Sequence, residues 1–311
     1  PDYDSIAQRS SGYFVMRSGW RRDDLLLLFE GASFGKLHQH EDMLSVDVYA
    51  YGTPFIVDPG ITSYFQNEWT TWYRISHAHN TVLVDGCGQA RRALQPQERW
   101  IESVKNRTYW HSDDSCDIVV ARYDGGYQGL PAREERGPVP MTVTGVTHTR
   151  SVIFVKPDYF VIFDELSSEE SQLDGRAHLY EGMFHFMPFR VLIDAETGAV
   201  RTGRMNQPNM EIIPITQMDV QLICGQNDPV QGWVSIDHQD VPAPVAVFST
   251  QGTLPIRTGY IVSPFEAGRP TAGVSAIAND ESGTWHVSIH HPDRNDEIKM
   301  DWSNEGPRFQ S

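Results

Sequence analysis

Cysteine is scarce in this sequence. Its 311 residues hold three cysteines, Cys87, Cys116 and Cys224, and no CxxC motif. An odd and low number gives no disulfide framework, and the lack of CxxC pairs excludes the common cysteine-rich zinc sites. At most one disulfide bridge can form, so the thiols do not decide the cellular compartment.

Positive charge and long apolar runs are also in short supply. Lys and Arg number 25 against 41 Asp and Glu, which gives a formal net charge of −16. Nucleic-acid-binding surfaces are basic, so this class of partner is not expected. No run of 18 apolar residues is present, so no membrane span is predicted. The chain starts at Pro1 without Met or a signal peptide, and we expect it to be processed or part of a longer protein.

Sustained helical periodicity is missing, and short strand-like runs take its place. Residues 44–50 alternate between apolar and polar side chains, and residues 147–155 and 159–166 flank a hairpin turn at Lys156–Asp158. Residues 61–76 fit a long loop or a short helix. This pattern predicts an all-β fold, either an antiparallel multi-stranded β-sandwich or a barrel-like sheet.

Two His-x-His pairs surround a carboxylate in a turn. The pairs are His38/His40 and His77/His79, and Asp58 lies in the Asp-Pro-Gly turn between them. Adjacent antiparallel strands can bring His40, Asp58 and His79 together, and this donor set suits zinc or a similar divalent ion. The same spacing also fits histidines at the surface or in a hydrogen-bonded core. His38 fits a ligand, a general acid or base, or a structural residue.

Aromatic and basic side chains follow the Asp-Pro-Gly turn. Tyr64, Tyr73 and Arg74 can supply a proton donor and a cation for a substrate carboxylate. Packing in a core is an equal alternative for Trp72 and Tyr73. Exposed aromatic rings near such a site also suit stacking against sugars.

One further polar pair is expected inside the fold. His148 and Arg150 alternate on a predicted strand, so their side chains share one face. We expect them to form a buried polar pair with a structural role.

Four motifs occur together in a fixed order. They are SGYFVMRSGW, the H-x-H-x-D of His38, His40 and Asp42, LSVDVYAYGTPFIVDPG, and RISHAHNTVLVDG. The hairpin HTRSVIFVKPDYFVIFDEL extends the match to about residues 11–190. With these motifs the chain resembles the C-terminal β-sandwich domain of the heparinase II/III-like polysaccharide lyases. The resemblance implies a sandwich of the super-sandwich type over residues 1–311. Separately, the polar and acidic composition of residues 167–175 predicts a seam there.

This resemblance implies an enzyme that cleaves uronic-acid polysaccharides, such as glycosaminoglycans or alginate, by β-elimination. A base removes the C5 proton of the uronate, its carboxylate is neutralised, and an acid protonates the leaving O4. Carried over residue by residue, the resemblance implies that His40, Asp58 and His79 bind Zn²⁺.

The resemblance also implies roles for the residues around that site. His38 matches the histidine that faces the substrate, and Arg74 matches a basic position before the HNT sequence. A tyrosine acts as acid or base in some members, and Tyr64 and Tyr73 are the candidates here. His77 stands where the family often has Arg, which weakens the case for anion binding.

The family normally carries an N-terminal (α/α) toroid, and no such helical region is present in these 311 residues. The chain is then either a fragment of a longer enzyme or a stand-alone sandwich, and in both cases half of the expected catalytic set, which the toroid would supply as a partner domain, is missing. The resemblance also implies an acidic polysaccharide substrate and a periplasmic or secreted location. A homo-oligomer is compatible with the sequence.

Two other function classes stay open. The first is a non-catalytic carbohydrate-binding or structural module in which zinc only holds loops together. The second is a metal-dependent oxygenase or isomerase, because two histidines and one carboxylate also suit Fe(II).

Overall fold

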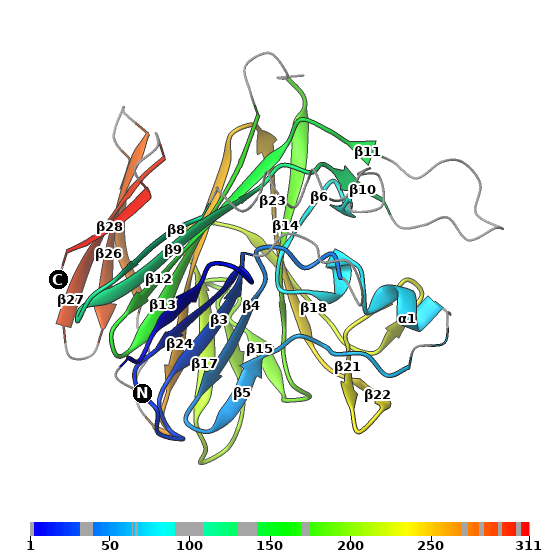
Figure 1. Cartoon of the computed structure of the whole chain (residues 1–311), viewed down its shortest axis with the longest axis horizontal. Coiled ribbons are helices and arrows are strands. Elements are labelled where there is room, and N and C mark those ends of the chain that lie inside the picture. The colour runs from blue at the N-terminus through cyan, green and yellow to red at the C-terminus, as the bar shows by residue number, and fades with distance from the viewer. Residues whose placement is uncertain are drawn as a thin grey trace.

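The computed structural model is built almost wholly from antiparallel β-strands (Figure 1). It describes residues 3–31, 40–63, 65, 68–90, 108–129, 142–168, 175–268, 273–279, 283–291, 294–302 and 306–310. Two expected site residues, His38 and Tyr64, lie outside the described residues. The strands confirm the predicted all-β, antiparallel fold, whereas the predicted seam near residues 167–175 stays a prediction.

Three sheets make up most of the molecule. A five-stranded meander follows chain order: β1 (Ile6–Gln8), β2 (Tyr13–Arg17), β3 (Leu26–Glu30), β4 (Val46–Ala50) and β5 (Thr53–Ile56). An eight-stranded sheet has the order β15 (Val191–Ile193), β16 (Val200–Thr202), β17 (Asn209–Pro214), β24 (Ile256–Phe265), β13 (Tyr159–Ser167), β12 (Thr147–Val155), β9 (Cys116–Tyr123) and β8 (Tyr109–Ser112). A four-stranded sheet has the order β18 (Asp219–Ile223), β23 (Val245–Thr253), β14 (Ala177–His185) and β6 (Val82–Val84).

Smaller elements complete the fold. The C-terminal sheet, at the left of Figure 1, runs through β25 (Gly273–Asn279), β26 (Thr284–His291), β27 (Arg294–Asp301) and β28 (Gly306–Gln310). A small three-stranded sheet has the order β11 (Thr142–Val143), β10 (Tyr127–Gln128) and β7 (Gly88–Gln89). Short pairs are formed by β19 (Gln226–Asn227) with β20 (Val230–Gln231) and by β21 (Trp233–Ile236) with β22 (Gln239–Pro242). Helical turns are α1 (Glu68–Trp72) and the 3₁₀ turn η1 (Ser76–Ala78). None of the helices in the described part of the chain is long and apolar enough to cross a membrane.

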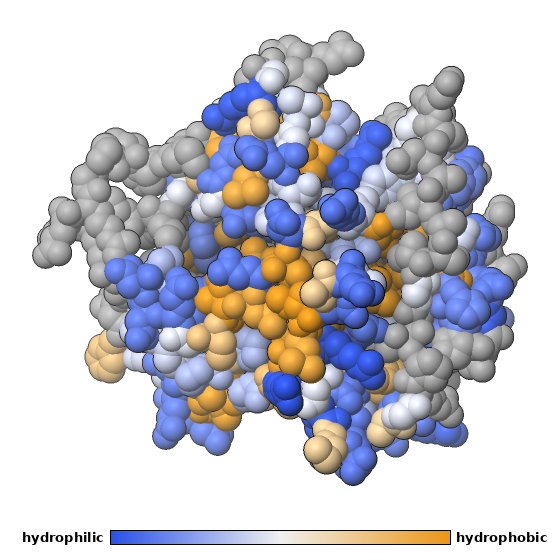
Figure 2. Space-filling view, turned by 180° about the vertical axis from the view of Figure 1, so that it is seen from behind, coloured by the Kyte–Doolittle hydropathy of each residue, from blue (hydrophilic) through white to orange (hydrophobic). Residues whose placement is uncertain are grey.

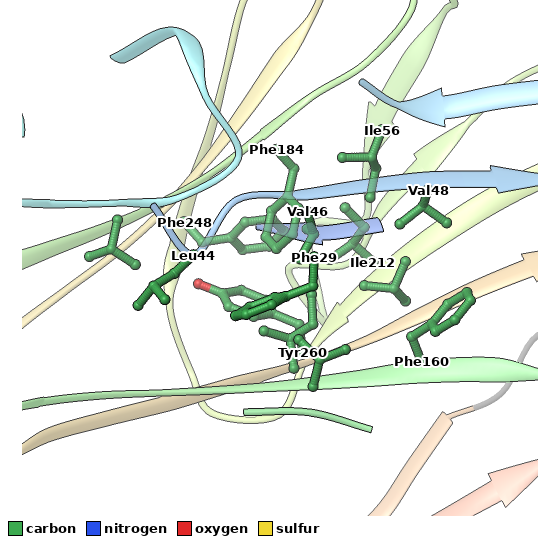
Figure 3. Close-up of a cluster of buried hydrophobic side chains, with 14 of the residues drawn as sticks. Phe29, Leu44, Val46, Val48, Ile56, Phe160, Phe184, Ile212, Phe248 and Tyr260 are labelled. Atoms are coloured by element: carbon green, nitrogen blue, oxygen red, sulfur yellow. The ribbon is translucent and has the colours of Figure 1, made fainter. Parts of the chain in front are cut away.

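The main core lies where the three large sheets meet. Phe29 comes from the five-stranded sheet, Phe184 and Phe248 from the four-stranded sheet, and Tyr260 from the eight-stranded sheet. Figure 3 shows these rings turned toward one another, and the Phe184 and Phe248 centroids lie 5.0 and 5.2 Å from that of Tyr260. Edge-to-face contacts of this kind add to the free energy gained by burial. This core therefore joins strands of all three large sheets, from β2 to β24, into one unit.

A second core covers the opposite face of the eight-stranded sheet. Ile153, Val161 and Phe163 pack there against Trp285 and other residues of the C-terminal sheet. Both faces of β12 and β13 are thus covered, so the residues of these strands are buried almost throughout instead of alternating between buried and exposed. The predicted hairpin is confirmed, with Val155 paired to Tyr159.

A buried ion network crosses the main core. Asp164 accepts hydrogen bonds from Arg150 Nε at 2.7 Å, His148 Nε2 at 2.7 Å and the Tyr180 hydroxyl at 2.7 Å. Arg150, His148 and Asp164 are all fully buried. The expected burial of His148 and Arg150 is confirmed, and the acid that pairs with both of them is Asp164.

Apolar side chains also cover part of the outer side of the four-stranded sheet. Leu83, Met183 and Val245 form a small cluster there, with Ile223 and Val247 packed against it. Seen from behind, the molecule has apolar residues gathered near the middle of its surface (Figure 2). A contiguous group of apolar surface residues is less common on soluble proteins than single exposed apolar residues are.

Candidate functional site

The three predicted metal ligands come together. His40 precedes β4, Asp58 follows β5, and His79 follows η1, yet one donor atom from each lies within 4.8 Å of the others. His79 Nδ1 and Asp58 Oδ2 are 2.9 Å apart, and the His40 and His79 ring centroids are 5.2 Å apart. Two imidazoles and a carboxylate at such distances form a donor set that suits a divalent metal ion such as zinc.

Asp58 is oriented by its own turn. Gly60 has a φ of 73°, a conformation that glycine adopts without strain, and its amide donates to Asp58 Oδ1 at 2.7 Å. The Ser235 amide, in β21, donates to the Pro59 carbonyl at 2.8 Å. One carboxylate oxygen is therefore fixed by the turn, while Oδ2 faces His79. The Asp58 side chain remains 38% exposed, which leaves the site open on that side.

The environment of the His79 side chain is the best test of whether the site fits a metal ion. Its side chain is fully buried, and its Nε2 atom has no hydrogen-bond partner among the described residues. A buried polar nitrogen without a partner is costly, and a metal bond at Nε2 would satisfy it while Nδ1 keeps its contact with Asp58. The donor atoms and this unpartnered nitrogen together fit a metal ion.

The charges around the triad also favour a cation. Burial would lower the pKa of His79, but the Asp58 carboxylate beside it outweighs burial and raises this pKa to about 9. Burial and the charge on His79 lower the pKa of His40. In the absence of a metal, His79 therefore carries the positive charge, and His40 is a neutral imidazole ready to act as a ligand.

A cavity of about 230 Å³ opens beside the triad. It is lined by Tyr13, Leu28, Glu30, Asp42, Ser45, Val46, Asp47 and Asp58. Burial, followed by the charge of Asp42, raises the pKa of Glu30 to about 9. Burial and Asp58 raise the pKa of Asp47 to about 7. Without a cation Glu30 therefore stays protonated near neutral pH and Asp47 is partly protonated, and a cation bound nearby would favour the ionised form of both.

Asn80 holds the backbone next to His79. Its Nδ2 donates to the Val46 carbonyl at 2.8 Å and the Val57 carbonyl at 3.1 Å, and its Oδ1 accepts from the His185 amide at 2.7 Å. The Asn80 carbonyl in turn accepts from Arg150 Nη1 at 2.6 Å. One asparagine therefore ties the ligand-bearing segment to β4, to the end of β5 and to β14.

Leu44, which lies between His40 and β4, has a strained backbone conformation. Its φ of 65° is uncommon for a residue other than glycine. The conformation is held because the Leu44 amide donates to the Glu30 carbonyl at 2.7 Å and its carbonyl accepts from Arg150 Nη1 at 2.8 Å. The buried ion network thus reaches the segment that follows His40.

Arg74 lies close enough to the triad for its charge to act on His40, and its catalytic role stays a prediction. Its carbonyl accepts from the Glu41 amide at 2.7 Å, which fixes the residue after His40. Its charge adds to burial and to His79 in lowering the pKa of His40. His77 lies nearby, with Nε2 at 3.2 Å from the Gly86 carbonyl.

Tyr73 and Trp72 belong to a packed cluster instead of an open surface. Tyr73 is fully buried and donates to Asp240 Oδ1 at 2.8 Å. Trp72 is 3% exposed and donates from its indole nitrogen to Gln231 Oε1 at 2.9 Å. Burial and the bond to Asp240 raise the pKa of Tyr73. Trp72 therefore packs in a core, as one of the two alternatives for it expected. A catalytic role for Tyr73 stays a prediction.

Sequence reasoning missed three ionisable residues that line the cavity. They are Tyr13, Glu30 and Asp47, which come from β2, β3 and β4. A signal existed for Asp47, because it stands on the polar side of the alternating strand. Glu30 ends an apolar run and gives no comparable signal, since its position depends on how three strands pair.

Known proteins match the chain in sequence and in fold. Two curated heparin-sulfate lyases are similar: one from Pedobacter heparinus is 21% identical over 173 residues, and one from Bacteroides stercoris is 25% identical over 170 residues. These matches cover 54% and 53% of this chain but only 22% and 21% of the relatives.

Solved structures show the same fold. The heparan sulfate lyase HepC from Pedobacter heparinus matches 96% of this chain with a TM-score of 0.71 at 16% identity, and a heparinase III structure matches 97% with a TM-score of 0.72 at 18% identity. The match covers 43% and 42% of those chains, so this chain spans less than half of their length. The model of the family described as "Heparinase II/III-like, C-terminal" matches residues 1–295. The chain therefore belongs to the heparinase II/III-like C-terminal family.

Proposed function

We propose that this chain forms one wall of the active site of a polysaccharide lyase that cleaves uronic-acid polysaccharides by β-elimination. The observation that carries the proposal is the meeting of His40, Asp58 and His79 beside Arg74, in a chain of this family. Two curated relatives are named heparin-sulfate lyases, which favours a glycosaminoglycan as the substrate class, with alginate as the alternative uronate polymer.

The chain's own residues would divide the chemistry among them. The guanidinium of Arg74 would neutralise the uronate carboxylate, which makes the C5 proton more acidic. His38 would face the substrate and exchange a proton with it, since an imidazole titrates near neutral pH. Tyr64 or Tyr73 would donate the proton to the leaving O4. For Tyr73 this requires that its hydroxyl leave Asp240, which makes Tyr64 the simpler candidate.

His40, Asp58 and His79 would hold a zinc ion. When bound, zinc supplies a fixed positive charge and joins the segments before β4, after β5 and after η1. The three residues would then stabilise the conformation of this side of the active site and orient the segment that carries His38. The half-exposed carboxylate of Asp58 leaves room for a water ligand.

The second wall would come from another domain. A helical toroid that contributes further catalytic groups is the partner we propose, and a homo-oligomer is compatible with it. An enzyme that acts on an extracellular polymer would be periplasmic or secreted.

The test is an elimination assay on the protein in its full length. Growth of ultraviolet absorbance from unsaturated uronate is measured on heparan sulfate and on alginate. We expect His38→Ala to slow the reaction by roughly 10²- to 10⁴-fold, the range of general acid–base catalysis. The matched control is His290→Ala, an exposed histidine of the C-terminal sheet, which should leave the rate unchanged. Zinc-loaded protein that acts on no uronate polymer would refute the proposal.

A structural module with a stapling zinc is the second candidate. The full burial of His79 and the origin of the donors in three separate segments favour it. In that case zinc removal lowers the melting temperature, sugar binding persists, and no unsaturated product forms under any condition. Iron instead of zinc in elemental analysis would point to an oxygenase.

A further inference from the structure

A second group of metal-binding side chains lies on the hairpin formed by β8 and β9. His111, Asp113 and Cys116 each offer a donor atom, and these atoms lie within 4.8 Å of one another. The three residues are close in sequence and are separate from the His40, Asp58 and His79 centre. They differ from that centre by including a thiol, which changes the class of ion that they can hold.

The Asp113 carboxylate is held in place by the turn. Its Oδ1 accepts from the Ser115 amide at 2.8 Å, the Ser115 hydroxyl at 2.7 Å and the Cys116 amide at 2.8 Å. Its Oδ2 is used differently and lies 2.8 Å from His111 Nε2. Oδ1 therefore stabilises the turn, and Oδ2 faces the His111 imidazole.

A neighbouring lysine binds the backbone and another carboxylate instead of Asp113 Oδ2. Lys156 Nζ donates to the Asp113 carbonyl at 2.7 Å and pairs with Asp117 Oδ1 at 2.7 Å. Asp117 is fully buried and also accepts from the Ser112 hydroxyl at 2.5 Å. The lysine charge is thus balanced by Asp117, and the Asp113 carboxylate keeps its negative charge for another partner.

One of the three donor side chains is buried and the other two are partly exposed. Cys116 is only 4% exposed, so its thiol stands on the packed side of the hairpin. The His111 and Asp113 side chains are 41% and 46% exposed, so they can adjust without disturbing the core. A tetrahedral zinc ion with bonds of about 2.0–2.3 Å needs donors roughly 3.3–3.8 Å apart. Because no two of the donor atoms are more than 4.8 Å apart, reaching these separations needs shifts of at most about 1.5 Å, which rotation of the exposed imidazole can supply.

We propose that this hairpin binds a thiophilic divalent cation of the zinc class through His111, Asp113 Oδ2 and Cys116 Sγ, with water in the fourth position. As the metal–sulfur bond forms, the Cys116 thiol releases its proton to solvent. A histidine, a carboxylate and a thiolate together favour zinc over calcium or magnesium, which prefer oxygen ligands alone. The ion joins the end of the edge strand β8 to the start of β9.

Cobalt(II) distinguishes this site from the other centre. A thiolate bound to Co²⁺ gives a strong charge-transfer band in the near ultraviolet, and the His40, Asp58 and His79 centre has no sulfur. We expect Co²⁺ titration of the intact protein to produce this band. Cys116→Ser should abolish it, and the matched control Cys224→Ser, at an exposed free cysteine, should retain it.

A second variant guards against misfolding. His111→Ala changes a half-exposed side chain, so its melting temperature without metal should equal that of the wild type. We expect it to weaken Co²⁺ binding at this site by at least about 100-fold, more than the loss of an outer-shell partner. The proposal is overturned if the wild type shows no thiolate band. It is also overturned if the band survives in Cys116→Ser, or if His111→Ala binds as tightly as the wild type. Because the band reports on sulfur alone, these outcomes do not depend on lyase activity.

Discussion

Replacing Asp164 by Asn tests the buried ion network directly. In the wild type, Asp164 accepts from Arg150 at 2.7 and 3.0 Å, from His148 at 2.7 Å and from Tyr180 at 2.7 Å. An amide cannot balance the charge of Arg150, which is fully buried. The substitution therefore leaves a guanidinium in the core without its counter-charge.

The expected cost is about 3–5 kcal/mol of unfolding free energy, the range for breaking a buried ion pair by removing one partner. The cost should extend over a wide pH range. Burial would raise the pKa of Asp164, but Arg150 and His148 outweigh it and hold this pKa well below its usual range. The stabilisation is therefore complete above the unfolded pKa of about 3.9 and is lost only as the pH falls through the lower folded value.

Urea unfolding of the two proteins at pH 7 and pH 5 measures this difference. Glu165→Gln is the matched control, because the next residue on β13 also pairs with an arginine, Arg257 at 2.9 Å, but both side chains are partly exposed. That pair should contribute less than about 1 kcal/mol. Equal losses for Asp164→Asn and Glu165→Gln would refute the argument from burial.

Three further predictions concern the site. Removing zinc with a chelator should lower the melting temperature, because an ion at 100 times its dissociation constant stabilises by about 2.7 kcal/mol. An unchanged melting temperature, measured by scanning fluorimetry on zinc-loaded protein, would argue against a bound ion. Burial and the charge of His79 lower the pKa of His185 to about 3, so the unfolding free energy should fall as the pH drops from about 6.5 toward 3. The pH dependence should flatten in His185→Gln, and an unaltered slope would exclude this residue as its source. Gly60→Ala forces alanine to a φ of 73°, at a cost of about 1–2 kcal/mol, and should weaken zinc binding. Gly198→Ala, at a φ of 71° in a distant turn, should cost as much in urea unfolding and leave zinc affinity unchanged.

The fold class followed from local patterns. The hairpin of β12 and β13 was predictable because its strands are long and flank a turn of Lys156, Pro157 and Asp158. The assignment of strands to three sheets was not, because it depends on contacts between distant residues. The pairing of β13 with β24, for example, joins Phe160 to Val262. Period-two patterns identify a buried face without saying which sheet covers it.

The site was predictable to the extent that its residues stand in motifs. His40, Asp58 and His79 were named from spacing and resemblance, and their donor atoms meet. Glu30 could not be named, since an acid at the end of an apolar strand looks like an ordinary solvated residue. Only the packing of β2, β3 and β4 buries it beside Asp42, and this burial and the charge of Asp42 raise its pKa.

The double coverage of the eight-stranded sheet has a consequence for biosynthesis. The strands β25–β28 follow all others in the chain, so they leave the ribosome after the sheet that they cover. Until they dock, Ile153, Val161 and Phe163 present an apolar sheet face to water. Partly folded chains with such faces associate readily. The interval between synthesis of β24 and docking of the C-terminal sheet is therefore the period in which this protein most needs protection from aggregation.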